Sequence, residues 1–234
     1  MLNQIKKDLQ KLKNPQKAKI SARFFKTGKG EYGEGDVFLG ITVPQQRKIA
    51  KKYPDLNLKQ LQNLLSSKIH EHRLTALFVL INKYRKADEK NKKEIFNFYL
   101  QNTKSINNWD LVDASSEHIL GDYLLEKNKT ILYKLAKSNN LWERRVAIMA
   151  TFEFIKNNRF QDTLKIAKIL LKDKHDLIHK AVGWMLREIG KRNQKVAEEF
   201  LKKHCQKMPR TMLRYAIEKF PDNKRKFYLR KPKK

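Results

Sequence analysis

The chain has 234 residues, and its 53 Lys and Arg against 24 Asp and Glu give a formal net charge of +29 at pH 7. Apolar residues make up 40% of the chain, which excludes a disordered tail, and the length suits one domain or one continuous array. The charge indicates a polyanionic partner. Nucleic acid is favoured over a membrane surface as this partner, because no apolar run approaches the roughly 20 residues of a spanning helix.

The N-terminal residues and the cysteine count indicate the compartment. Residues 2–12 alternate leucine and isoleucine with lysine, so they predict an amphipathic helix rather than a secretory signal. Cys205 is the only cysteine, which excludes an internal disulfide and favours a reducing compartment. We therefore expect a soluble, cytoplasmic protein without a membrane partner.

Apolar residues recur at helical spacing along almost the whole chain, which predicts an all-α fold. A glycine-rich segment, 27–36, and a short apolar run, 37–43, separate the second expected helix from the third. The expected helices lie near 2–12, 20–26, 44–53, 57–66, 70–86, 90–101, 108–125, 129–137, 141–157, 160–173, 176–191, 194–205 and 209–219. Short polar connections favour antiparallel helix pairs in a single domain, 1–234, whose basic end, about 224–234, is either an ordered helix or a flexible tail.

A faint repeat runs through these helices. The segments His72-Arg73-Leu74-Thr75-Ala76, Arg144-Arg145-Val146-Ala147 and His179-Lys180-Ala181-Val182 each open a helix with basic residues followed by small or branched ones. Their spacing of about 35 residues per unit is typical of two-helix HEAT-like repeats. Stacked pairs form a superhelical array, and we expect its concave face to be a basic groove that binds phosphates.

One motif and one site class are excluded by their context. Residues 28–33 spell G-x-G-x-x-G, but a dinucleotide loop needs a strand before it, and here a helix precedes and acidic residues follow. We therefore interpret this segment as a loop beside the binding groove. The six histidines and one cysteine lack metal-site spacing, and no activated nucleophile has its usual context, so no metal or cofactor is expected.

The segment 107–113 places Trp109 and Asp113 one helical turn apart. In a structural role, Asp113 would stabilise the start of its helix or pair with Arg145. In a functional role, a carboxylate in a basic groove would stabilise positive charge on a sugar during cleavage of a glycosidic bond, or orient a water molecule. The residues alone leave both roles open.

The tryptophans and their basic neighbours have two interpretations as well. Trp109, Trp142 and Trp184 suit either a helix core or contact with a base, a deoxyribose or a cationic purine. Basic side chains near the second and third tryptophans are candidate phosphate contacts, with a solvated surface as the alternative. They are Arg144, Arg145, Lys180 and Arg187.

Several separated segments carry a family resemblance. They are 22–26, 30–40, 109–113, 120–122, 141–148, 180–188 and 208–216. The most specific are Trp-Asp-Leu-Val-Asp at 109–113 and Leu-Trp-Glu-Arg-Arg-Val-Ala-Ile at 141–148. In this order they resemble the bacterial DNA alkylation repair family, the HEAT-like repeat alkylpurine DNA glycosylases, over nearly the whole chain.

This resemblance implies a monofunctional hydrolase that excises positively charged N3- and N7-alkylated purines from double-stranded DNA without a cofactor. Asp113 matches the family's catalytic carboxylate, and Trp109 and Trp184 match aromatic residues that pack against the deoxyribose of the lesion. Arg145 matches a contact with the DNA backbone. The resemblance also implies a monomer that acts in the bacterial cytoplasm, at the nucleoid.

The chain departs from the family pattern near its N-terminus. Phe24-Phe25 stands near a position where some members carry a tyrosine, and the glycine loop is long, so the resemblance assigns no lesion contact at this end. The family also contains members that bind DNA without excising bases. The alternative function is therefore a non-catalytic HEAT-like nucleic-acid-binding module, and a third is a protein-interaction scaffold.

Overall fold

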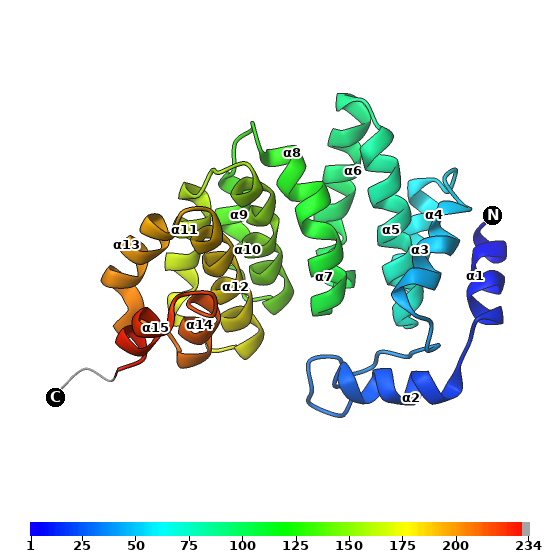
Figure 1. Cartoon of the computed structure of the whole chain (residues 1–234). Helices are drawn as coiled ribbons and strands as arrows, with labels where there is room; N and C mark the ends of the chain where they lie inside the picture. Colours follow the sequence, from blue (N-terminus) through cyan, green and yellow to red (C-terminus); the bar gives the residue numbers. More distant parts are fainter. Residues whose placement is uncertain (231–234) are drawn as a thin grey trace. The chain divides into compact units, whose positions relative to one another are not determined.

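The structure, a computed structural model, describes residues 1–230. These residues form two compact units, one of residues 1–115 and one that begins at Ser116 (Figure 1). The described part contains no β-strand, and Val37 and Ile69 form only an isolated bridge. The all-α prediction is therefore confirmed, whereas the single domain and the groove stay predictions. None of the described helices is both long and apolar enough to cross a membrane.

The first unit is built around one long helix. Its helices are α1 (Leu2–Lys11), α2 (Pro15–Phe24), α3 (Val43–Lys51), α4 (Leu58–Leu65), α5 (His70–Lys86), α6 (Glu89–Gln101) and α7 (Trp109–Ser116), the last of which ends at the unit boundary. Helix α5 packs against α3, α4 and α6. It buries residues on every face, as expected of a helix that is enclosed by its neighbours.

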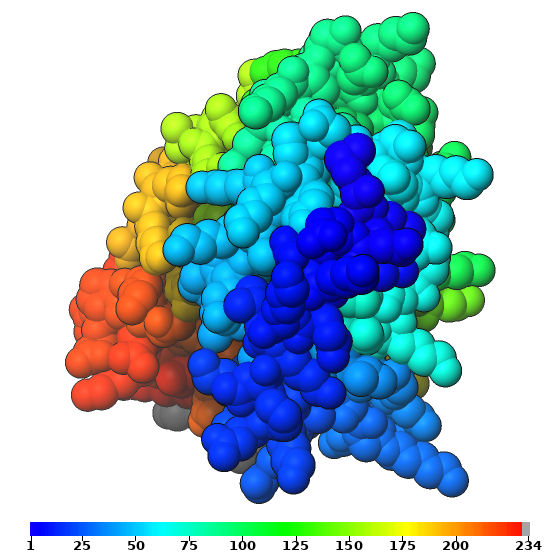
Figure 2. All heavy atoms as spheres, turned by 90° about the vertical axis from the view of Figure 1, so that its right-hand side faces the viewer, coloured from blue at the N-terminus to red at the C-terminus, as the bar shows by residue number. Residues whose placement is uncertain are grey.

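Helix α2 starts earlier than the sequence predicted. The side chain of Asn14 accepts a hydrogen bond from the backbone N–H of Lys17 at 3.0 Å, and Pro15 occupies the first helical position, where its missing N–H costs nothing. Helix α2 lies crosswise to α1 and α3 and has no buried residue (Figure 1). Figure 2 views the first unit with α1 and α2 at the surface. Ile20 and Phe24 are 68% and 63% exposed.

The second unit opens with a π-helical turn, Glu117–Gly121. Its helices are α8 (Asp122–Leu124), α9 (Thr130–Leu135), α10 (Leu141–Lys156), α11 (Gln161–Ile169), α12 (Asp176–Arg192), α13 (Gln194–His204), α14 (Arg210–Ala216) and α15 (Asp222–Leu229). Helix α10 packs against α12, and α12 packs against α14. These contacts form the core of the second unit.

Two glycines permit the closest helix contacts of this unit. A Cβ atom on Gly183 of α12 would lie 2.5 Å from the carbonyl oxygen of Met212 on α14. A Cβ atom on Gly121 would lie 2.3 Å from the carbonyl oxygen of Ala150 on α10. Since these distances are shorter than any real contact of a Cβ atom, only glycine fits at either position.

One further segment differs from the sequence prediction, and another is one for which the sequence left two structures open. The single helix expected at 108–125 is α7, the π-helical turn and α8, because the wider turn changes the hydrogen-bond pattern after Ser116. The basic end from about residue 224, for which the sequence left an ordered helix and a flexible tail open, is helical in α15 as far as Leu229, where Tyr228 is buried and Phe227 is 64% exposed. Residues 231–234 lie outside the described residues.

Candidate functional site

The start of α7 carries Trp109 and Asp113, and its first turn is held by neighbouring side chains. The backbone N–H of Trp109 donates to Oδ1 of Asn108 at 2.8 Å, and that of Leu111 donates to Oδ1 of Asp110 at 2.8 Å. These bonds satisfy N–H groups that have no partner within a helix. Trp109 and Asp113 are both half-buried. The predicted helical spacing of these two residues is therefore present.

Trp109 is part of a stack of aromatic rings. Its indole stacks on Phe25 at a centroid distance of 5.2 Å and meets the edge of Phe24 at 5.8 Å. Phe25 stacks on Phe38 at 5.1 Å, and Phe38 stacks on the imidazole of His70 at 4.5 Å. The aromatic residues at the end of α2 thus support one side of Trp109, in a segment where the sequence departs from the family pattern.

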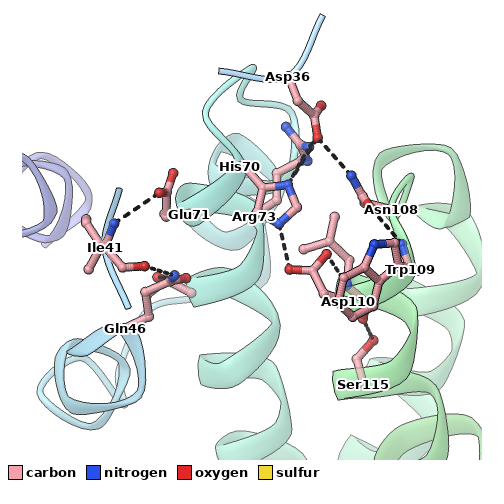
Figure 3. A network of polar contacts seen from close by, with 12 residues as sticks. Asp36, Ile41, Gln46, His70, Glu71, Arg73, Asn108, Trp109, Asp110 and Ser115 are labelled. Carbon is pink, nitrogen blue, oxygen red and sulfur yellow. Dashed lines mark hydrogen bonds and ion pairs between the residues drawn. The ribbon is translucent and has the colours of Figure 1, made fainter. Parts of the chain in front are cut away.

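A buried polar network lies beside this stack (Figure 3). Nδ1 of His70 lies 3.0 Å from Oδ2 of Asp36, and Nε2 of His70 lies 2.8 Å from Oδ2 of Asp110. Nη2 of Arg73 lies 2.7 Å from the same Asp36 oxygen, and Nη1 of Arg73 donates to the carbonyl of Ser67. No local pattern in the sequence predicts this network, because its members come from a loop and two helices.

The network shifts the pKa of two of its members. Burial lowers the pKa of His70, but the hydrogen bonds with Asp110 and Asp36 outweigh it and leave the pKa above its ordinary value. Burial raises the pKa of Asp36, but the hydrogen bond with His70 and the charge of Arg73 outweigh it and leave that pKa below its ordinary value. Both shifts favour the charged forms.

Asp113 lies on α7 near Tyr99 of α6. Burial raises the pKa of Tyr99, and the charge of Asp113 raises it further, against the hydrogen bond with Ser115. The hydroxyl of Tyr99 lies 2.9 Å from Oγ of Ser115, which donates to the carbonyl of Leu111 at 2.6 Å. Tyr99 therefore stays neutral, and the only charge that this group of side chains contributes is that of the carboxylate.

The glycine loop provides Asp36 rather than a nucleotide site. The backbone N–H of Gly28 donates to Glu31 at 2.9 Å, and that of Gly30 donates to Glu34 at 2.8 Å. These carboxylates occupy N–H groups that a phosphate would need. No strand precedes the loop in the described residues. The loop instead ends at Asp36, which is bound by His70 and Arg73.

The candidate phosphate contacts all lie in the second unit and have partners within it. Arg145 is 5% exposed and donates to the carbonyl of Leu177, at the start of α12, at 2.5 Å. Arg144 pairs with Asp173 at 2.6 Å. Lys180 pairs with Asp176 at 2.6 Å, and Arg187 pairs with Glu218. Their contacts with DNA stay predictions.

The other two tryptophans have different environments. Trp142 is 8% exposed and belongs to the core. Trp184 is half-buried and lies 6.0 Å from the ring of Phe152, which the cations of Lys156 and Arg192 also face. Trp184 and Trp109 belong to different units, so their predicted contact with one deoxyribose stays a prediction. No described group of His, Cys, Asp and Glu side chains is arranged to hold a metal ion.

Comparisons with known proteins give the family. The sequence profile of the family described as DNA alkylation repair enzyme matches residues 5–220. A solved structure described as a predicted DNA alkylation repair enzyme from Enterococcus faecalis is 19% identical, with a TM-score of 0.69 over 90% of this chain and 97% of that chain. Curated proteins give no match.

Two solved structures from Streptococcus mutans have the same fold. AlkD2 is 19% identical, with a TM-score of 0.58 over 77% of this chain and 91% of that chain. The protein smu.31 is 20% identical, with a TM-score of 0.55 over 77% of this chain and 93% of that chain. With the profile match over most of its length, the chain belongs to the DNA alkylation repair enzyme family.

Proposed function

We propose that this protein is a DNA glycosylase that removes N3- and N7-alkylated purines from double-stranded DNA, with Asp113 as its catalytic carboxylate. Family membership and the net charge of +29 support a DNA substrate. The observation that carries the proposal is the pairing of Asp113 with Trp109, one turn apart on a helix whose start is fixed by Asn108 and Asp110.

The proposed chemistry needs only a carboxylate and water. Alkylation at N3 or N7 makes the purine cationic, so the base leaves as a neutral molecule when its bond to C1′ breaks. The sugar then carries oxocarbenium character, which the negative charge of Asp113 stabilises. Water adds to C1′ and releases one proton, and the products are an abasic site and the free base. No metal or cofactor takes part.

The proposed contacts divide between the two units. Trp109 and Trp184 would pack against the deoxyribose of the lesion, where an aromatic face also suits a cationic base. Arg144, Arg145, Lys180 and Arg187 would hold backbone phosphates or the helix starts that do so. We further propose that the protein acts as a monomer, in the cytoplasm and at the bacterial nucleoid.

Replacement of Asp113 tests the proposal. We expect Asp113→Asn to bind an N7-methylguanine duplex about as tightly as the wild type and to release base on the order of 10²- to 10³-fold more slowly, since a preorganised charge contributes about that factor. The matched control is Asp55→Asn, an exposed aspartate of the same unit, which should release base at the wild-type rate. An Asp113→Asn variant with full activity would exclude the proposed role. Tight DNA binding without base release by any of the proteins would favour the non-catalytic module.

A further inference from the structure

His70 has a carboxylate at each of its ring nitrogens. Nδ1 lies 3.0 Å from Asp36, and Nε2 lies 2.8 Å from Asp110. A neutral imidazole carries a single N–H and can donate to only one of them, whereas an imidazolium donates to both. An aspartate accepts hydrogen bonds and, when ionised, donates none. With both aspartates ionised, only the protonated histidine donates to both of them. The other neighbour of Nδ1 is Nη2 of Arg73 at 3.5 Å, and this nitrogen makes a shorter contact with Asp36, at 2.7 Å.

The charges around His70 lead to the same form. The side chains of His70, Asp36 and Arg73 are 2%, 4% and 4% exposed, and that of Asp110 is 15% exposed. With His70 protonated, two cations balance two carboxylates. With His70 neutral, Arg73 still pairs with Asp36, but the carboxylate of Asp110, which is only 15% exposed, loses its cation, and this is costly where water screens the charge only in part. The rings of Phe25 and Phe38 pack on the imidazole and add no charge.

His70 connects to Trp109 by three routes. Asp110 accepts from His70 with Oδ2 and from the N–H of Leu111 with Oδ1, so it ties the start of α7 to α5. Nδ2 of Asn108 donates to Oδ2 of Asp36 at 3.5 Å, and Oδ1 of the same side chain accepts from the N–H of Trp109. The ring of Phe25 lies 5.1 Å from the imidazole and 5.2 Å from the indole of Trp109, between centroids, so it contacts both.

We propose that protonated His70 is a positioning residue that fixes the first turn of α7, and with it Trp109 and Asp113, for base excision. The effect on base excision rests on the proposed glycosylase function. The fixing of the first turn of α7 by His70, Asp36 and Asp110, which we call the clamp, does not. His70 touches no substrate in this proposal. Its deprotonation as the pH rises releases one aspartate, loosens the first turn of α7 and slows excision without weakening DNA binding.

The test combines two variants with a control. His70→Gln keeps a hydrogen-bonding side chain but cannot carry charge, and Asp110→Asn keeps the shape of the carboxylate but removes its charge. The control is His204→Gln, in the second unit and outside the proposed site. The measurements are the pH dependence of single-turnover base release, the affinity for DNA, and nuclear magnetic resonance of the His70 ring nitrogens and the Trp109 indole N–H.

For the wild type, we expect both ring nitrogens of His70 to remain protonated well above pH 6.5, the ordinary histidine value. The Trp109 indole resonance should move with the same titration, and the rate of base release should fall with it. Asp110→Asn should move both changes to lower pH. His70→Gln should bind DNA within about threefold of the wild type and excise on the order of tenfold more slowly, because a small misplacement of catalytic groups costs rate.

Two outcomes would overturn the inference. One is a neutral His70 ring at pH 7, and the other is a Trp109 resonance that does not respond when His70 titrates. If the wild type releases no base but the two resonances still titrate together, the clamp stands and the proposed function fails. A rate of base release that stays constant while His70 titrates would exclude the catalytic consequence. Equal effects of His70→Gln and His204→Gln would exclude a specific role.

Discussion

At the scale of single residues, two histidines of α5 show how partners set a pKa. His70 has two aspartates as partners, and its pKa lies above the ordinary value. Burial and the charges of Lys6 and Arg73 lower the pKa of His72 to about 4, and its Nδ1 lies 3.0 Å from the hydroxyl of Ser67. The two side chains therefore affect stability at opposite ends of the pH range.

His72 should make the protein sensitive to acid. Below pH 6.5 the unfolded chain binds a proton at this side chain, while the folded chain binds it only near pH 4. The free energy of unfolding should therefore fall between these values, by roughly 1–3 kcal/mol. His72→Gln should reduce that fall, as measured by urea unfolding at pH 7, 5 and 4. Parallel pH profiles for the two proteins would contradict this.

His70 serves as the opposite case. Because its folded pKa is raised, its contribution to stability is fully present below about pH 6.5 and is lost as the pH rises through the folded value. His70→Gln should therefore destabilise the protein at pH 6 more than at strongly alkaline pH. Comparison of the pH profiles of His70→Gln and His72→Gln separates the alkaline effect of His70 on stability from the acid effect of His72.

The sequence predicted only part of the candidate site. Trp109 and Asp113 lie on one helix, so their spacing alone brings them together. The hydrogen bonds of His70 with Asp36 and Asp110 join a loop to two helices, and no local pattern in the sequence predicts them. The burial of Arg145 also depends on long-range packing, since its acceptor is Leu177 on another helix.

At the scale of elements, close packing of α12 on α14 depends on Gly183. A Cβ atom there would lie 2.5 Å from both the Met212 carbonyl oxygen and Cβ of Tyr215. Gly183→Ala should therefore lower the free energy of unfolding by about 1–3 kcal/mol, because backbone must move to admit the methyl group. Thermal or urea unfolding measures this.

Gly190, on the same helix, is the matched control. A Cβ atom there would first meet the Phe220 ring, at 3.1 Å, and a ring at the end of a side chain yields more easily than backbone. Alanine also favours a helix over glycine by about 1 kcal/mol. Gly190→Ala should therefore be close to neutral, and an equal loss in both variants would show that packing at Gly183 is not the cause.

Helices were more predictable than their ends. The apolar spacing of 3.6 residues identified most of them, because it reflects burial of one face. The predicted start of α2 was wrong because Asn14-Pro15 both ends one helix and begins the next, and a proline is compatible with the end of a helix and with its first position. The π-helical turn at Glu117–Gly121 was missed because it leaves the apolar spacing almost unchanged.

At the scale of the whole molecule, the net charge of +29 should make DNA binding strongly dependent on salt. The individual cations differ in whether they are available to DNA or stabilise the fold. Lys180 is 40% exposed at its side chain, whereas Arg145 is buried and donates to a backbone carbonyl. An exposed ion pair contributes little to stability, while a buried carbonyl that loses its donor costs about 1–3 kcal/mol, and the part-buried carbonyl of Leu177 should cost a fraction of that.

Two substitutions distinguish these roles. Lys180→Ala should leave the melting temperature unchanged and reduce the slope of log affinity against log salt by about one. Arg145→Ala should lower the melting temperature and weaken binding through the start of α12. A salt slope that Lys180→Ala leaves unchanged would argue against a phosphate contact by that residue. An unchanged melting temperature for Arg145→Ala would argue against its structural role.

Base release by the unmodified protein tests the central claim most directly. The substrate is a duplex with one N7-methylguanine, and the measured products are the free base and the alkali-sensitive abasic site, compared with spontaneous loss in buffer. We expect release well above the spontaneous rate by the wild type and almost none by Asp113→Asn. Release at the spontaneous rate, by a wild-type protein that still binds the duplex, would exclude the proposed glycosylase activity.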